Sequence, residues 1–228
     1  MKPTQGADPA LASDLLLLVL NEQTGRFPRM SSMDAIVSVA LFVDLAARGR
    51  LEFFGDDHRV FVTDASPTGS PVLDDVLTML QQAEGDRPTA AIRLIAKGRF
   101  DQVVQGLVDS GALVEHETRA LGAFRRRTWR HSGRGPISSL RKNLDDVLVQ
   151  GAKPTVRTAL LISVMVQLKL LTEAMPGHGG KRVAARAEEI MQEASGTNFP
   201  PGALGESDET WIFPTSDTER AFYLGNLF

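Results

Sequence analysis

The side chains that most often carry catalysis or bind metal are scattered along this chain. Its four histidines are His58, His116, His131 and His178. None of them has metal-ligand spacing with another histidine or with a carboxylate. Cysteine is absent, which excludes disulfides, thiolate metal sites and cysteine nucleophiles. The glycine-rich segment 177–180 leads into Lys181 and Arg182, whereas a phosphate loop needs Ser or Thr after its lysine. We therefore expect neither an enzyme nor a bound cofactor.

A short basic segment carries the strongest chemical signal in the chain. Residues 119–142 hold eight lysines and arginines and no acid, although the whole chain has 25 basic and 28 acidic residues. Residues on a strand alternate between its two faces, so Arg125, Arg127 and Trp129 should share one face and Arg126 and Arg130 the other. A tryptophan beside arginines suits the headgroup region of a membrane, where the indole and guanidinium groups are both favourable.

Two other partners for this basic segment stay open. The arginines could pair with acids of this protein or of a partner protein, as charge clusters on protein surfaces often do. The order of helix, glycine, strand, turn and basic strand also matches a winged helix that binds nucleic acid. The reading helix, beginning at Arg99, would then present Asp101 and Asp109 to phosphates, and the net charge of −3 adds to the repulsion. We expect nucleic acid to be the least suitable partner.

The elements that must position these residues are mostly helical. Periodic apolar positions predict helices over 8–21, 31–48, 70–82, 89–96, 99–110, 139–150, 154–174 and 181–194. Ser70 is expected to cap its helix, and 154–174 reads as one central buried helix. Segments near 51–62 and 112–129 predict two short β-hairpins. The fold class expected is therefore mainly α.

The sequence predicts one helical domain over residues 1–203 and a distinct tail over 204–228. The tail holds five acids, one arginine and the aromatic residues Trp211, Phe213, Phe222, Tyr223 and Phe228. Because aromatic residues are rare in disordered tails, we expect the tail to dock, either on the basic hairpin or on a neighbouring subunit in a homo-oligomer. The apolar runs 15–20 and 159–166 are too short for a signal peptide or a membrane span. We expect a cytoplasmic protein.

Three segments in order resemble the Golgi phosphoprotein 3 family. They are VDLAARGRLEF, TDASPTGSPVLDDVLTML and LVDSGALVEHE, and the resemblance extends over roughly 11–196. It implies a single helical domain with a four-helix core, surrounding amphipathic helices and two short β-hairpins. It also implies a peripheral membrane protein that binds phosphatidylinositol 4-phosphate beside a hairpin that enters the bilayer. Members occur in actinobacteria, which fits the Ala- and Arg-rich composition of this chain.

The resemblance assigns candidate residues to both parts of that site. Headgroup-binding positions fall at Phe27, Arg29, Lys97 and Arg99, and the family's arginine in the second helix is replaced by Ser38. The hairpin positions expected to contact the membrane or an anion are Leu121, Phe124, Arg125, Arg126, Arg127, Trp129, Arg130 and Arg134. We therefore expect a protein that binds a phosphoinositide-like anionic lipid on the inner face of the membrane. The alternative is an interaction module whose basic hairpin pairs with its own acidic tail or with a partner.

Overall fold

The computed structural model describes residues 9–28, 33–55, 57–119, 125–178 and 180–197. The described residues are mainly helical and include two separate antiparallel hairpins, which confirms the expected fold class. The helices are α1 (Leu11–Val19), α2 (Met33–Ala47), α3 (Pro71–Gln81), α4 (Pro88–Ala96), α5 (Arg99–Asp109), α6 (Ile137–Leu148), α7 (Val156–Gln167), α8 (Leu171–Ala174) and α9 (Lys181–Thr197). The strands are β1 (Leu51–Phe54), β2 (Arg59–Val62), β3 (Leu113–Arg119) and β4 (Arg125–His131).

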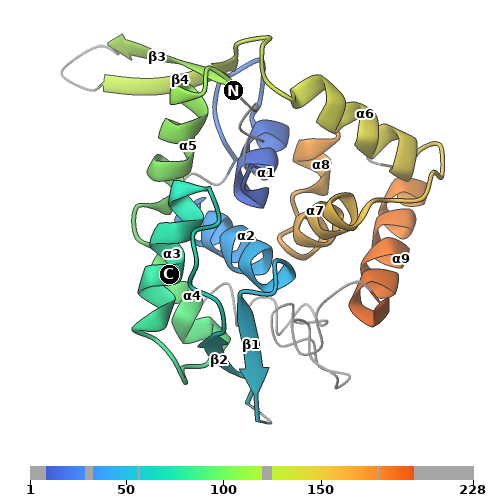
Figure 1. Cartoon of the computed structure of the whole chain (residues 1–228). Coiled ribbons are helices and arrows are strands. Elements are labelled where there is room, and N and C mark those ends of the chain that lie inside the picture. Colours follow the sequence, from blue (N-terminus) through green and yellow to red (C-terminus); the bar gives the residue numbers. More distant parts are fainter. Residues whose placement is uncertain (1–8, 29–32, 56, 120–124, 179, 198–228) are drawn as a thin grey trace, which may run out of the picture.

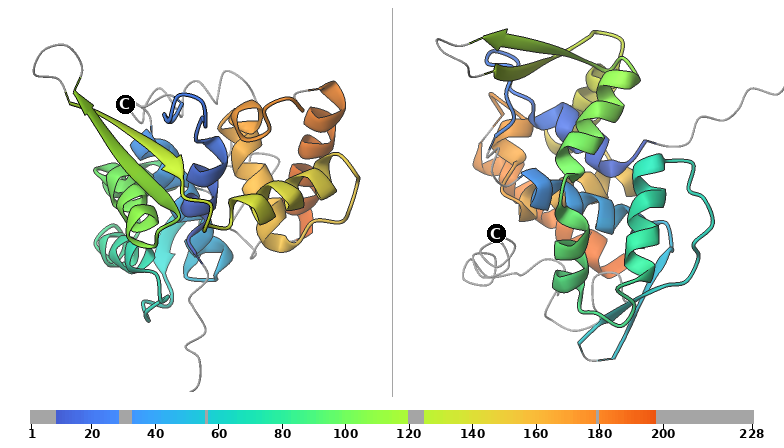
Figure 2. Two further views of the ribbon diagram at one scale, coloured as in Figure 1. Left: turned by 90° about the horizontal axis from the view of Figure 1, so that it is seen from above. Right: turned by 90° about the vertical axis from the view of Figure 1, so that its left-hand side faces the viewer.

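Helices α1 and α2 form the centre of the molecule. Figure 1 shows them between α3, α4 and α5 on one side and α6 to α9 on the other, and the view from above in Figure 2 agrees. Almost every residue of α1 and α2 is buried, and α7 is buried along most of its length. A helix that is apolar on nearly all sides can only be stable inside a core, so these three helices supply most of it.

Two acidic side chains in this core have partners. Asp44 of α2 accepts hydrogen bonds from the Leu11 N–H at 2.7 Å and from Arg48 Nε at 2.8 Å. Asp14 of α1 accepts from Arg157 Nε at 2.9 Å and Nη2 at 2.6 Å. Buried carboxylates are tolerated only when they are paired in this way. These bonds tie α1 to α2 and to α7.

Each hairpin is entered through a helix that ends at a glycine. Gly49 and Gly111 have φ values of 67° and 72°, in the left-handed region that favours glycine. At both ends the next N–H bonds back to the helix, from Arg50 to the Leu45 carbonyl at 3.0 Å and from Ala112 to the Leu107 carbonyl at 2.9 Å. This is the Schellman arrangement, and it directs the chain into β1 and β3.

The segment 154–174 is interrupted, which corrects the prediction of one long helix. α7 ends at Gln167, and Lys169 takes a φ of 54°. Leu170 N–H bonds to the Met165 carbonyl at 2.8 Å, so this end is also a Schellman cap, with lysine in the position that glycine usually takes. The short helix α8 follows. A second correction concerns Ser70, whose side chain makes no capping hydrogen bond to α3.

Candidate functional site

Three aromatic rings bring the expected headgroup loop, the start of α5 and the second hairpin together. The ring centroid of Phe27 lies 5.1 Å from that of Phe100 and 5.3 Å from that of Trp129. Phe100 and Trp129 are 6.1 Å apart in an edge-to-face arrangement, a geometry that aromatic pairs favour. Segments near 27, 100 and 129 therefore meet at one place, as the resemblance implies.

The inner face of the hairpin is the face that carries Glu115, Arg127 and Trp129, and its arginine forms ion pairs with acidic side chains of the protein. Arg127 bonds to Glu115 on β3 and to Asp101 on α5, the latter at 3.0 Å from Nη1 to Oδ1. Its guanidinium carbon also lies 5.3 Å from the centroid of the Trp129 ring, a cation–π contact. The hydrogen bond to Glu115 raises the pKa of Arg127 above its ordinary value, against the opposing effect of desolvation. Arg127 and Trp129 share a face as expected, but this face points toward the protein.

A backbone contact fixes the loop 21–26 to the free edge of β4. The Trp129 N–H donates to the Gly25 carbonyl at 2.8 Å. Gly25 has a φ of 65°, and a Cβ at this position would lie 2.9 Å from the Trp129 carbonyl oxygen. Only glycine fits such a close approach of two backbones. The loop that leads to Phe27 and Arg29 is therefore held against the hairpin.

The end of β4 is held by Glu22, which contacts the guanidinium of Arg141 and the imidazole of His131. Arg141 Nη1 lies 2.8 Å and His131 Nδ1 3.2 Å from Glu22 Oε1, and His131 Nε2 lies 2.9 Å from the Leu17 carbonyl oxygen. The hydrogen bond from Arg141 lowers the pKa of Glu22, while desolvation opposes it.

The start of α5 is capped by a carboxylate from α2. Asp34 Oδ1 accepts from the Phe100 N–H at 2.8 Å, and Oδ2 accepts from the Gly98 N–H at 3.3 Å. The first N–H groups of a helix attract anions, and here a side chain of the protein occupies them. Ser38 lies one turn further along α2, fully buried, with its hydroxyl donating to the Asp34 carbonyl at 2.6 Å.

Three of the residues expected to contact lipid are buried in the fold. Phe27 is 4%, Arg99 8% and Trp129 2% exposed. Arg99 bonds to Asp75 and Gln102, and its Nε donates to the Ile95 carbonyl at 2.8 Å. Together with a contact from Nη2 to Met79 Sδ at 2.9 Å, these bonds engage four of the five N–H donors of Arg99 within the protein.

The outer face of the hairpin carries an exposed valine and an exposed arginine. Val114 of β3 is 43% exposed, and Val114 and Arg130 are directly opposite each other in the sheet. Arg130, Lys97, Arg26 and Arg134 are exposed, and none of them forms a side-chain ion pair with another described residue. Arg125 and Arg126 belong to β4, but their side chains lie outside the described part of the chain. Arg29, Leu121 and Phe124 also lie outside the described residues.

Comparison with known protein families confirms the resemblance that three segments of the sequence indicated. A family model described as Golgi phosphoprotein 3 (GPP34) matches residues 11–207. The chain belongs to the Golgi phosphoprotein 3 family. The match begins with α1 and includes every helix and strand described above. No curated protein matches the chain.

The segment 64–74 resembles the Golgi phosphoprotein 3 family most closely. Its side chains form hydrogen bonds that hold the loop before α3 in place. Asp64 accepts hydrogen bonds from Arg50 and, at 2.8 Å, from the Ser66 N–H. Asp74 Oδ1 accepts from the Thr68 N–H at 2.7 Å and from the Thr68 hydroxyl at 2.6 Å. Hydrogen bonding from Ser66 lowers the pKa of Asp64. These hydrogen bonds give the motif a structural role.

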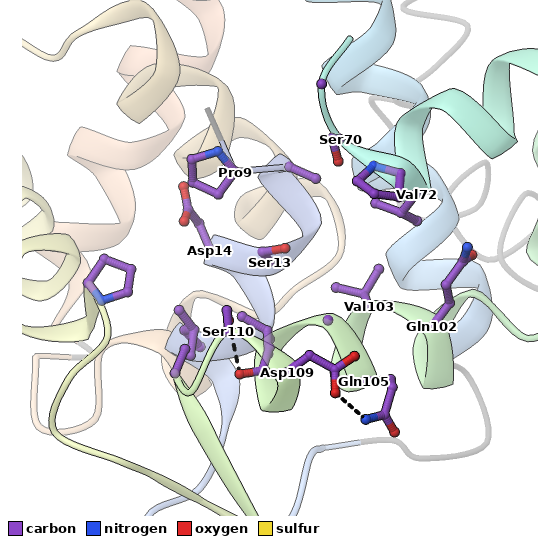
Figure 3. Close-up of a pocket in the computed structure, with 18 residues that line it drawn as sticks. Pro9, Ser13, Asp14, Ser70, Val72, Gln102, Val103, Gln105, Asp109 and Ser110 are labelled. Atoms are coloured by element: carbon purple, nitrogen blue, oxygen red, sulfur yellow. Dashed lines mark hydrogen bonds between the residues drawn. The ribbon is translucent and has the colours of Figure 1, made fainter. Parts of the chain in front are cut away.

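A cavity of about 680 Å³ lies away from the aromatic rings. It lies between the start of α1, the start of α3 and the side of α5, as Figure 3 shows. Its lining includes Asp14 and Asp109 but no lysine or arginine, so it does not suit an anionic ligand. Within the described residues, no three His, Asp or Glu side chains are grouped so as to hold a metal ion. None of the described helices combines the length and hydrophobicity needed to cross a membrane.

Proposed function

We propose that this Golgi phosphoprotein 3 family member is a peripheral membrane protein that binds anionic lipid headgroups through the outer face of its second hairpin. The observation that carries the proposal is the division of charge across the hairpin. On the inner face Arg127 is neutralised by Glu115 and Asp101, whereas on the outer face Arg130 is exposed without an ion pair among the described residues. A cation without a partner remains free to attract a phosphate.

The strength expected of such binding follows from the number of exposed cations. A lysine or arginine near an anionic leaflet contributes about 1 kcal/mol at best, and salt screens the attraction. Arg26 precedes Phe27, Lys97 lies three residues before Phe100 and Arg130 follows Trp129, so these exposed cations adjoin the three segments that meet at the rings. Their sum is enough for reversible association that weakens as salt is raised.

We propose that recognition depends more on total charge than on one lipid. The position that would select phosphatidylinositol 4-phosphate is altered, because Asp34 occupies the N–H groups at the start of α5 and Arg99 is paired with Asp75. Lys97 is the candidate cation that stays exposed there. We therefore expect similar affinity for different anionic lipids at equal surface charge. Nucleic acid suits this surface less well, since Asp101 and Asp109 are on α5.

Vesicle co-sedimentation tests the proposal. The full chain is mixed with phosphatidylcholine vesicles containing phosphatidylinositol 4-phosphate, phosphatidylserine or neither, at low and at high salt. We expect binding to both anionic vesicles at low salt and loss at high salt. Arg130→Glu should weaken binding roughly tenfold, because it changes two charges at the surface. Lys153→Glu, the same change at an exposed lysine before α7, is the control. Absence of binding to every anionic vesicle at low salt would overturn the proposal.

A further inference from the structure

We propose that the acidic, aromatic tail (residues 204–228) docks on the outer face of the β3–β4 hairpin of its own chain and competes there with the membrane. The docking is independent of the proposed function, whereas the competition rests on it. The tail lies outside the described residues, so the argument starts from the surface that would receive it.

The outer face of the hairpin is both cationic and apolar. Val114 is 43% exposed and lies opposite Arg130 in the sheet, with the exposed His116 two residues along β3. On the opposite face of the same hairpin Trp129 is buried, and Arg127, although 41% exposed, is paired with Glu115 and Asp101. An exposed guanidinium attracts carboxylates and can stack on aromatic rings, so this face is suited to a ligand that offers both.

The tail has the matching composition. Its five acids are Glu206, Asp208, Glu209, Asp217 and Glu219, against one arginine, and it holds five of the aromatic residues of the chain. The family match ends at 207, so most of this composition lies beyond the family domain. The cavity beside α5 is a poor alternative, because its described lining includes Asp109 and no basic residue that could attract the tail acids.

The tail is long enough to reach the hairpin within one molecule. The described chain ends at Thr197 in α9, and 31 residues follow. An extended segment of that length spans roughly 100 Å, whereas a domain of this size is on the order of 40 Å across. A tethered segment also has an effective concentration of about a millimolar, so individually weak contacts suffice.

Cross-linking in the full chain tests the docking. The chain has no cysteine, so Ser216→Cys in the tail can be combined with His116→Cys on β3 or, as a control, with Lys153→Cys before α7. We expect the intrachain cross-link to His116→Cys to form several times faster than the link to Lys153→Cys. The difference should disappear when the five tail acids are changed to Asn or Gln. Equal rates in the original tail would overturn the docking, and cross-linked dimers in place of the intrachain product would show that the tail docks on a second copy.

Vesicle binding tests the competition separately. The full chain with the five tail acids neutralised should bind phosphatidylserine vesicles several times more tightly than the original chain. Neutralising five acids also raises net charge, so the control neutralises five exposed acids of other elements, Glu52, Glu84, Asp86, Glu188 and Glu189. A gain no larger than that of this control overturns the competition while the cross-linking result stands. If no variant binds vesicles, both the proposed function and the competition are overturned. The docking of the tail is then decided by the cross-linking experiment alone.

Discussion

The Trp129 ring packs against both Phe27 and Phe100, and its indole N–H has no hydrogen-bond partner among the described residues. Replacing the ring by Ala should lower the free energy of unfolding by about 3–5 kcal/mol, because a large buried side chain is lost. Phe at this position keeps an aromatic ring and removes the unpaired N–H, so we expect a loss of less than about 1.5 kcal/mol. Urea unfolding of Trp129→Ala and Trp129→Phe checks both values. Equal stability of Trp129→Ala and the original chain would contradict the burial.

Glu22 should make a pH-dependent contribution to stability. Its pKa is ordinarily 4.5 and is lowered in the folded protein by the Arg141 hydrogen bond. A carboxyl with a lowered folded pKa stabilises the fold fully above its unfolded pKa, and the contribution is lost as the pH falls through the folded pKa. The Glu22 side chain is 56% exposed, so solvent screening keeps the effect below about 1 kcal/mol.

Urea unfolding of Glu22→Gln measures this effect. We expect the variant to be less stable than the original chain at neutral pH and equally stable well below pH 4.5. Glu84→Gln serves as the control, since Glu84 is exposed and forms no ion pair with another described residue. The same difference between Glu22→Gln and the original chain at both pH values would be evidence against the ion pair.

At the scale of elements, the Asp34 side chain of α2 caps the start of α5. Asp34→Ala removes both hydrogen bonds to the Phe100 and Gly98 N–H groups. We expect a loss of about 1–2 kcal/mol in the free energy of unfolding, because helix N-caps contribute this much. Hydrogen exchange at the Phe100 amide should also become faster. Asp34→Asn keeps an acceptor and should lose less stability. If the Phe100 amide exchanged no faster in either variant than in the original chain, the cap would be refuted.

Sequence periodicity located most elements because their signals are local. The glycines at 49 and 111 end α2 and α5 within a few residues of the expected positions, since a left-handed φ is nearly free for glycine. The end of α7 was missed because Lys169 takes the same conformation without the glycine that would have marked it. Its strain is offset by the burial of Leu170, which is 0% exposed. A compensation of that kind comes from packing and has no local sequence signal.

At the scale of the whole molecule, Asp14 and Arg157 join α1 to α7. The side chain of Asp14 is 4% exposed and that of Arg157 is 34% exposed. Arg157→Met leaves a buried carboxylate without its cation and should cost about 3–5 kcal/mol. The double variant Arg157→Met with Asp14→Asn should recover much of that loss, because no charge stays buried. Urea unfolding of both variants checks this, and a double variant as unstable as Arg157→Met would contradict the assigned role.

The sequence by itself determined the mainly helical fold, the two hairpins and the family, because helical periodicity, glycine caps and the motif around Asp64 are local patterns. It also indicated which residues of β4 share a face, since alternation along a strand is fixed by the backbone. Only the tertiary structure decided which face meets the core. The face with Trp129 packs on Phe27 and Phe100 and so is buried, while Arg130 stays in solvent. The Arg99–Asp75 pair likewise joins residues from different helices. Contacts between distant segments depend on how the elements pack, and no single stretch of sequence encodes that packing.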